Sequence, residues 1–372
     1  MPTRLVAPVV VVLAFFVGGE VLAACPDFAP ATHYAVGEGT AAVAVGDFNR
    51  DGAIDLAVAN HMRVSILSGI GDGKFLAAVH YKTGLHSASS VAVGDLNRDG
   101  NSDLVVASYN ANANGVSVFL GDKSGTFTAV GTYLGGMQPT YVTVGDVDGD
   151  GDIDIAVVNP VAKKISVLKG DDKGKFASPE NYDAGKAPTT VAIGDVNRDG
   201  RLDLAVANQG SNDVSILIGL AGGIFDTAKH YAVGAAAHAV AIGDVNGDAS
   251  ADLVVAKGVN MKNVAVLLGD GSGKFPTFTD YSAGTTPTSV VIGDFDRDGV
   301  SDIAAGNQSS HTVSVFRGKG AGAFAAASTY ASGKGPTSVA IADFNKDGKS
   351  DLAVANSWSN SVAILINTCT CP

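Results

Sequence analysis

The sequence predicts an all-β fold, a seven-bladed β-propeller with four antiparallel strands per blade, in which the N-terminal strand closes the last blade. Three features support this prediction: a repeat of about 49 residues that occurs seven times, four short apolar segments in each repeat, and a last repeat divided between the two ends of the chain. The composition agrees, because 47 Gly among 372 residues and 46% hydrophobic residues suit a β-rich core better than a helical one.

One recurring segment defines the repeat, and its first copy reads VAVGDFNRDGAIDLAVAN from Val43. Its leading Asp recurs after 48, 51, 49, 49, 50 and 49 residues. A fixed period of roughly 20 to 50 residues is typical of solenoids and propellers. The leading residues of the seven copies are Asp47, Asp95, Asp146, Asp195, Asp244, Asp294 and Asp343.

Four strands are predicted in each repeat, separated by clusters of Gly, Asn and Asp. In the fourth repeat three of them are residues 191–194, 204–207 and 214–218, and the fourth strand carries Phe225 and Tyr231. A Phe and a Tyr six residues apart recur in every repeat. Since alternate residues of a strand share a face, we expect both rings on one face of the fourth strand, packed against the neighbouring sheet.

The two ends of the chain complete each other. The last repeat stops after its third strand (362–367), and the chain begins with an unpaired fourth strand (28–34). Pairing these two strands closes the ring and leaves no open sheet edge. We therefore expect one propeller domain over residues 25–372, with blades at about 40–84, 88–136, 139–185, 188–234, 237–284, 287–333, and 336–367 together with 27–37.

Residues 1–24 are predicted to be a signal peptide. Arg4 is followed by an apolar run over residues 5–17 and by small residues at Ala23 and Ala24. The run is short for a membrane span, and no later apolar stretch approaches twenty residues. We expect a secreted, periplasmic or cell-surface protein without a transmembrane span.

A nine-residue loop of the form D-x-[ND]-x-D-G-x-x-D links the first two strands of each repeat. Carboxylate and amide oxygens at positions 1, 3, 5 and 9, with a backbone carbonyl at position 7, are the hard ligands that suit Ca²⁺. We expect up to seven calcium ions, one per blade. The predicted ligands are Asp47, Asn49, Asp51, Ala53, Asp55; Asp95, Asn97, Asp99, Asn101, Asp103; Asp146, Asp148, Asp150, Asp152, Asp154; Asp195, Asn197, Asp199, Arg201, Asp203; Asp244, Asn246, Asp248, Ser250, Asp252; Asp294, Asp296, Asp298, Val300, Asp302; and Asp343, Asn345, Asp347, Lys349, Asp351.

The charge balance supports metal binding. The loops hold 24 of the 37 acidic residues, and the net charge is −12. Without cations these carboxylates repel one another, so metal binding and folding should be coupled. A turn-forming role alone is the alternative for a single loop, but seven loops at a constant period favour metal. Ala249 replaces the expected Gly in the fifth loop, so we predict that the site between Asp244 and Asp252 is the weakest.

These loops, together with the G-x-F and Y-x-x-G landmarks, resemble the FG-GAP and VCBS repeats of integrin α-subunit propellers, exported bacterial propellers and some fungal lectins. The resemblance spans residues 28–367 and implies a calcium-binding seven-bladed propeller of the exported bacterial type. In that family the nine-residue loops bind calcium on one propeller face. Family functions range over adhesion, carbohydrate binding and scaffolding, so the resemblance leaves the ligand open.

The cysteines occupy the two ends of the chain, at Cys25, Cys369 and Cys371. Alignment of the last repeat on the fourth places all three where the seventh blade lacks a covalent turn. A disulfide from Cys25 to Cys369 or to Cys371 would lock the ring in an oxidising compartment. The run Leu22-Ala23-Ala24-Cys25 also resembles a lipoprotein box, in which Cys25 would carry a lipid anchor.

The propeller face opposite the acidic loops is the predicted recognition surface. The connections from second to third strand and from each blade to the next lie there, and they vary between repeats. For any single residue an ordinary solvated loop is the alternative. The candidate ligand-face residues are Trp358, Tyr109, His61, Arg63, Tyr141 and His311.

The sequence favours a binding protein over an enzyme. Its seven His residues are scattered, no Cys lies between the termini, and most carboxylates belong to the acidic loops. The acidic balance without a basic stripe argues against nucleic acid as a partner. We expect a non-catalytic, monomeric interaction or adhesion module for an extracellular protein or glycan. A lectin-like propeller is the alternative, and a polysaccharide hydrolase or lyase is a further one.

Overall fold

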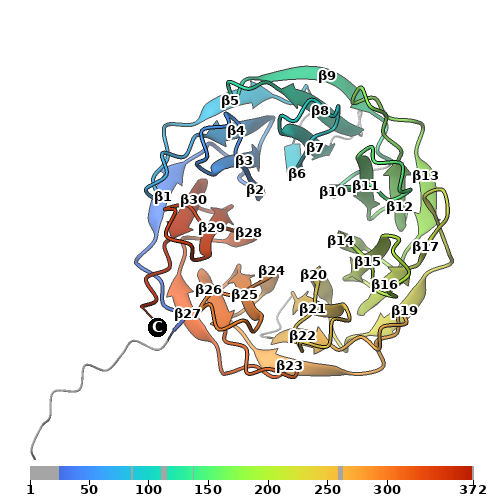
Figure 1. Cartoon of the computed structure of the whole chain (residues 1–372), viewed down its shortest axis with the longest axis vertical. Helices are drawn as coiled ribbons and strands as arrows, with labels where there is room; N and C mark the ends of the chain where they lie inside the picture. Colours follow the sequence, from blue (N-terminus) through green and yellow to red (C-terminus); the bar gives the residue numbers. More distant parts are fainter. Residues whose placement is uncertain (1–24, 85–86, 110–114, 137, 259–262, 371–372) are drawn as a thin grey trace, which may run out of the picture.

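The computed structural model describes residues 25–84, 87–109, 115–136, 138–258 and 263–370, so the predicted signal peptide at 1–24 lies outside the described residues. Seven four-stranded antiparallel sheets stand radially around a central axis (Figure 1). The predicted seven-bladed all-β propeller is confirmed. No helix long and apolar enough to cross a membrane occurs among the described residues.

Each blade runs from an innermost strand at the axis to an outer strand at the rim (Figure 1). The innermost strands are β2 (Ala42–Gly46), β6 (Ser87–Gly94), β10 (Tyr141–Gly145), β14 (Pro188–Gly194), β20 (Ala237–Gly243), β24 (Pro287–Gly293) and β28 (Pro336–Ala342). The second strands are β3 (Asp55–Asn60), β7 (Asp103–Tyr109), β11 (Asp154–Asn159), β15 (Asp203–Asn208), β21 (Asp252–Lys257), β25 (Asp302–Asn307) and β29 (Asp351–Asn356).

The outer half of each blade is built in the same way. The third strands are β4 (Arg63–Leu67), β8 (Gly115–Gly121), β12 (Lys164–Leu168), β16 (Asp213–Leu217), β22 (Asn263–Leu267), β26 (Thr312–Phe316) and β30 (Ser361–Leu365). The outer strands are β5 (Val79–Lys82), β9 (Phe127–Tyr133), β13 (Glu180–Asp183), β19 (Lys229–Ala232), β23 (Phe278–Ser282), β27 (Ser328–Ala331) and β1 (Thr32–Ala35). A small hairpin, β17 (Gly219–Leu220) with β18 (Ile224–Phe225), precedes β19.

The N-terminal strand closes the ring, as predicted. Strand β1 pairs antiparallel with β30, with Tyr34 opposite Val362, and completes the sheet β1-β30-β29-β28. Figure 1 shows the two ends of the chain side by side, the blue β1 against the red β30. Because the seventh sheet then has four strands like the others, every blade is flanked by two complete neighbours.

The core is a set of layers between blades rather than one central cluster. Among the described residues seven apolar clusters occur, and each joins two adjacent blades. The second strands are buried on both faces, as in the run DLAVAN of β15. A sheet that is covered on both faces needs such nearly continuous apolar strands, and this explains why the second strand of each repeat does not alternate with polar residues.

The recurring Phe and Tyr connect neighbouring blades. The prediction that both rings lie on one strand is wrong outside β9, because the other outer strands begin after the Phe. Instead the Tyr of one blade packs edge-on against the Phe of the next, as Tyr231 does against Phe275 at 5.6 Å between ring centroids. Tyr330 closes the circle on Phe28 at 5.2 Å. The shared packing against a neighbouring sheet was correctly expected.

Candidate functional site

The predicted acidic loops lie between the innermost and second strands, and the last Asp of each loop is the first residue of the second strand. These seven carboxylates are at most 1% exposed. Each accepts two backbone N–H groups: Asp103, for example, accepts from Leu96 and from Gly121, both at 2.8 Å. The last Asp therefore ties its loop to the end of the third strand, a role that the loop motif alone does not indicate.

The other loop carboxylates fold the backbone around themselves. The Asp47 carboxylate accepts from the N–H groups of Asp51 and Gly52, at 3.1 and 2.9 Å. The Asn49 amide oxygen also accepts from Asp51, and Asp51 accepts from Ala53 at 2.7 Å. Because each side-chain oxygen is directed back over the turn, the loop gathers its oxygens on its inner side.

Two loops bring three carboxylates together. Oxygens of Asp146, Asp148 and Asp154 lie within 4.8 Å of one another, and the same holds for the three carboxylates of the sixth loop (Asp294, Asp296, Asp298). These are the two loops that have Asp rather than Asn at position 3. Clustered carboxylate oxygens are groups that could hold a metal ion.

None of the ion pairs between described residues involves one of the seven buried carboxylates. Burial and, to a smaller extent, repulsion from the neighbouring loop carboxylates raise the pKa of Asp103, Asp154, Asp302 and Asp351 to about 6, although two backbone N–H groups lower it. Burial also raises the pKa of the equivalent Asp55, Asp203 and Asp252. A cation in the loop would favour the ionised form of each group. The residues present therefore fit an oxygen-coordinated cation.

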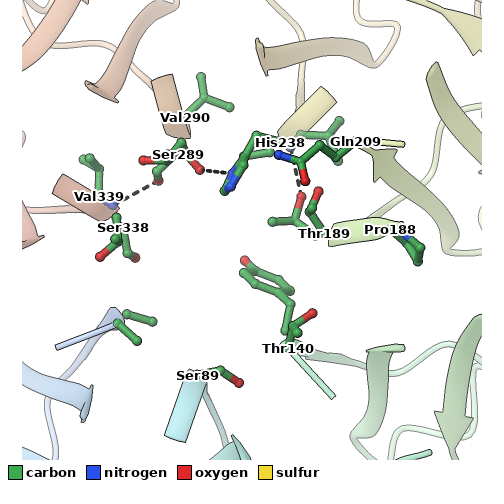
Figure 2. A pocket seen from close by; sticks show the side chains of 18 of the residues that line it. Ser89, Thr140, Pro188, Thr189, Gln209, His238, Ser289, Val290, Ser338 and Val339 are labelled. Carbon is green, nitrogen blue, oxygen red and sulfur yellow. Dashed lines mark hydrogen bonds between the residues drawn. The ribbon is translucent and has the colours of Figure 1, made fainter. Parts of the chain in front are cut away.

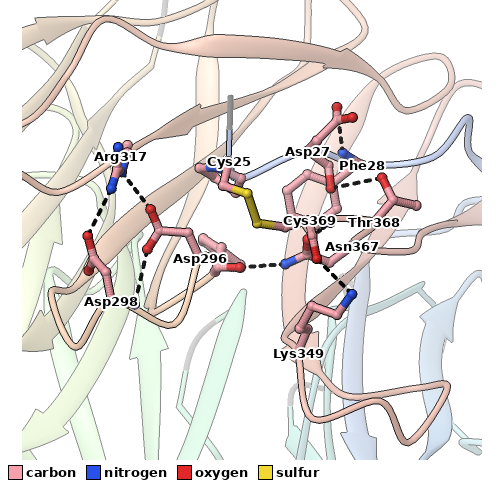
Figure 3. Close-up of a disulfide and its surroundings, with 12 residues drawn as sticks. Cys25, Asp27, Phe28, Asp296, Asp298, Arg317, Lys349, Asn367, Thr368 and Cys369 are labelled. Atoms are coloured by element: carbon pink, nitrogen blue, oxygen red, sulfur yellow. Dashed lines mark hydrogen bonds and ion pairs between the residues drawn. A yellow bond between two sulfur atoms is a disulfide. The ribbon is translucent and has the colours of Figure 1, made fainter. Parts of the chain in front are cut away.

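The sixth loop already holds a positive charge. The Arg317 guanidinium contacts Asp296 at 2.5 Å and Asp298 at 3.2 Å, as Figure 3 shows. In the third loop Arg98 contacts Asp152, at 2.7 Å, rather than one of the three clustered carboxylates. Asp152 is position 7 of its loop, where the backbone carbonyl rather than the side chain is the expected metal ligand. The contact with Arg98 therefore leaves the side-chain ligands of the third loop free for a cation, whereas in the sixth loop Arg317 would compete with a cation for Asp296 and Asp298.

Basic residues at loop position 4 connect one loop to the next. Arg98 donates to the carbonyls of Asp150 and Gly151, at 2.9 and 3.1 Å. Arg198 donates in the same way to Asp248 and Ala249, at 2.7 and 3.1 Å. The predicted ligand positions did not include these residues, although Arg or Lys recurs at position 4 in five of the seven loops and Gly stands there in the third and fifth.

The fifth loop is strained where Ala replaces Gly. Ala249 has φ +63°, whereas the equivalent Gly residues have φ between +78° and +88°. We predict that Ala249→Gly increases the free energy of unfolding by about 0.5 kcal/mol, because relief of left-handed strain exceeds the cost of a more flexible unfolded chain. Chemical denaturation with saturating calcium measures this change.

Gly200→Ala is the matched control for that substitution. A Cβ at Gly200 would meet no atom within 4 Å, so only backbone strain at φ +81° opposes it. We expect Gly200→Ala to lower the free energy of unfolding by about 1 kcal/mol. Shifts of the same sign in both variants would contradict the assignment of strain to this position.

The predicted ligand-face residues occupy several blades, and the structure brings Trp358 and His311 together. Their rings meet edge-on with centroids 5.2 Å apart. Trp358 is 56% exposed and lies against Gly335, where a Cβ would approach the indole to 2.6 Å. The exposed His61 lies in the turn between β3 and β4, and the exposed Arg63 is the first residue of β4. The side chain of Tyr109 lies outside the described residues.

Tyr141 lies at the propeller axis rather than on an exposed loop. It begins β10, is half-buried, and lines a cavity of 490 Å³ formed by the first residues of the innermost strands. We call this space the axial cavity. Figure 2 shows Ser89, Thr140, Thr189 and His238 among the side chains arranged around it. The propeller face opposite the acidic loops is therefore hollowed at its centre.

A disulfide closes the seam beside β1. Cys25 is bonded to Cys369, with 5.4 Å between their Cα atoms (Figure 3). Lys349 of the seventh acidic loop donates to the Cys369 carbonyl at 3.0 Å. Of the two predicted partners the structure selects Cys369, and Cys371 lies outside the described residues. A Cys25 thiol held in this bond is not available for a lipid anchor.

Comparison with known proteins gives a family match and a set of similar folds. The family model for the FG-GAP-like repeat matches residues 47–106, 95–157, 146–206, 195–255, 244–305 and 300–354. No curated protein sequence matches the chain.

Three solved structures share the fold at low identity. One is an Agrocybe aegerita lectin that specifically recognises non-reducing terminal N-acetylglucosamine (TM-score 0.57, 16% identity, 87% of this chain and 86% of that chain). Another is BBS1N in complex with ARL6DN (TM-score 0.65, 11% identity, 92% and 98%). The third is a streptogramin B lyase (TM-score 0.62, 16% identity, 91% and 97%).

Proposed function

The chain belongs to the FG-GAP-like repeat family, and from this premise we propose that it is a calcium-stabilised propeller that binds a partner and catalyses no reaction. The observation that carries the proposal is the repeated acidic loop. All seven loops present oxygen ligands beside a buried carboxylate, on a fold whose opposite face is free of this motif.

Calcium suits these loops because their ligands are hard oxygens alone. Asp or Asn side chains at positions 1, 3, 5 and 9 and the carbonyl at position 7 would hold the ion. Bound calcium would supply the charge that stabilises each buried carboxylate, and it would fix the turn between the first two strands. The chain's own contribution is to orient the oxygens through the backbone N–H groups described above. We expect the fifth and sixth loops to bind calcium more weakly than the others. In the sixth loop the reason is Arg317, which already pairs with the Asp296 carboxylate.

The recognition face would bind an extracellular protein. The Cys25–Cys369 disulfide is compatible with an oxidising, exported location. Trp358 supplies an exposed aromatic ring that His311 and Gly335 hold in place, and such rigid aromatic groups dominate many protein interfaces. Variable connections around it favour one composite surface over seven equal sites.

Carbohydrate binding is the second candidate, and the same exposed indole favours it, since aromatic faces also pack against sugar rings. The similar lectin and the similar lyase share only the fold with this chain, so neither assigns a ligand or a reaction. A polysaccharide hydrolase or lyase activity is the third and least supported alternative.

A binding experiment with a matched control tests the recognition face. Wild type, Trp358→Ser and Leu76→Ser are immobilised with calcium and probed with extracellular proteins and a glycan array. Trp358 and Leu76 are equally exposed at 56%, but Leu76 lies beside the first acidic loop. We expect Trp358→Ser to weaken binding at least tenfold, as loss of a roughly 2 kcal/mol hot spot would, and Leu76→Ser to leave it unchanged. Equal binding by all three proteins would remove Trp358 from the site.

A further inference from the structure

The axial cavity is lined by residues from all seven innermost strands. Two successive positions near the start of each strand form two rings of side chains around the propeller axis. At the first position five blades have Ser or Thr, and His238 and Ala41 occupy the others. At the second position four blades have Ser or Thr, and the remaining three have Tyr141, Ala42 and Ala239.

The hydroxyl groups in these rings hold neighbouring blades together. Thr288 Oγ1 donates to the carbonyl of Pro336 in the next blade at 2.9 Å. Ser289 Oγ accepts from the N–H of Val339, also in the next blade, at 3.0 Å. Most hydroxyl residues at these positions are thus explained by the fold, and the exception is Thr140, whose buried Oγ1 has no hydrogen-bond partner among the described residues. Tyr141 and His238 interrupt this pattern and need another explanation.

Both exceptions offer polar atoms that the fold does not use. His238 Nδ1 donates to the carbonyl of Thr288 at 2.9 Å, which leaves Nε2 as an acceptor with no hydrogen-bond partner among the described residues. Burial lowers the pKa of His238, in agreement with a neutral ring. The Tyr141 hydroxyl likewise has no partner in the described part of the chain. Gln209 also lines the cavity and adds a side-chain amide.

The chemistry of the cavity limits what it can hold. No Asp, Glu, Lys or Arg is among the lining residues, so a charged ligand would lose its hydration without gaining a counter-charge. A volume of 490 Å³ lies within the roughly 300–1,000 Å³ of small-molecule sites. An aromatic ring, a neutral imidazole acceptor and an amide match a ligand whose hydroxyl groups both donate and accept.

We propose that the axial cavity binds a neutral saccharide of one or two sugar units, free or at the end of a chain, through Tyr141, His238 and Gln209. The proposal rests on the proposed binding function and adds a ligand class and a site to it. It requires neither the Trp358 surface nor a protein partner.

Calorimetric titration of the calcium-loaded mature chain tests this site. The probes are glucose, galactose, N-acetylglucosamine and their β-linked dimers, with glucuronic acid and glucosamine as charged counterparts. We expect at least one neutral probe to bind, and its charged counterpart to bind at least tenfold more weakly. Absence of heat at roughly 10 mM of every neutral probe, where a millimolar Kd would still register, overturns the proposal.

Variants that restore the ring pattern locate the binding. Tyr141→Ser and His238→Thr introduce residue types that other blades carry at these positions, so the fold should tolerate them. Each should weaken saccharide binding at least tenfold. The control Thr189→Ser, in the same ring of side chains as His238, should change the affinity less than twofold. If a substitution lowers the melting temperature, Tyr141→Phe and His238→Asn replace it. Tyr141→Phe keeps the ring and removes the hydroxyl, and His238→Asn keeps an N–H donor for the Thr288 carbonyl and removes the Nε2 acceptor.

Three further outcomes separate this inference from the proposed function. Saccharide binding that Trp358→Ser abolishes and Tyr141→Ser leaves intact would place the sugar on the outer surface and overturn the axial site. Calcium-dependent stability without saccharide binding would overturn the axial site and leave the metal loops standing. Saccharide binding by a protein that contains no stoichiometric calcium, and whose melting temperature chelation leaves unchanged, would support the axial site and overturn the metal loops.

Discussion

Removal of metal from the purified protein should lower its melting temperature by roughly 10 °C or more, the largest effect that we expect. An ion that binds only the folded chain stabilises it by about 2.7 kcal/mol at a hundredfold excess over its Kd, and this gain applies at each occupied loop. In a chain of this size about 1 kcal/mol corresponds to a few degrees. The loss of metal also leaves the buried carboxylates without a counter-charge. Scanning calorimetry before and after chelation, with elemental analysis of the loaded sample, measures both the effect and the stoichiometry.

The pH dependence of the metal-free protein is the control for this prediction. Asp103, Asp154, Asp302 and Asp351 have a pKa of about 6 when folded, against an ordinary value of 3.8. Each binds a proton more tightly in the folded state, so the stripped protein should gain stability as the pH falls from 7 toward 5. The loaded protein should lose stability over the same range, because protons compete with the cation.

Two results would contradict the metal assignment. One is a loaded sample that contains no stoichiometric calcium. The other is a melting temperature that chelation leaves unchanged at pH 7. Either would reduce the acidic loops to turns held by their own backbone hydrogen bonds.

Loss of the disulfide should have the second largest effect. The bond joins residues 344 positions apart, and closing so long a loop lowers the entropy of the unfolded state, which raises its free energy by about 6 kcal/mol at 25 °C. The Cys25→Ser/Cys369→Ser double variant should therefore unfold at a markedly lower denaturant concentration. Guanidinium titration of both proteins, with and without reductant, gives the difference.

Cys371→Ser is the matched control for the disulfide. It should match the wild type, because the structure pairs Cys25 with Cys369. Reductant should destabilise the wild type and leave the double variant unaffected. An acylated Cys25 in the mass spectrum of the mature protein, or equal midpoints for all three proteins, would show that the seam is held by strand β1 alone.

The sequence by itself determined the number of blades, the antiparallel strands within them, the closure by the N-terminal strand and the position of the acidic loops. All of these follow from features that are local in the chain: a period, an apolar alternation, and ligand types at fixed spacing. The position of Ala249 in a left-handed turn also followed, because the other loops have Gly at this point. Local patterns repeat seven times here, so a weak signal in one repeat is strengthened by the others.

Only the tertiary structure decided how the blades contact one another. The pairing of Tyr231 with Phe275, the reach of Arg98 to the next loop, and the meeting of Trp358 with His311 all join residues about 40 to 50 positions apart. The convergence of Tyr141 and His238 on the axial cavity is of the same kind. Such contacts depend on the angle and distance between adjacent sheets, which packing of the whole ring sets, and no spacing within one repeat specifies them.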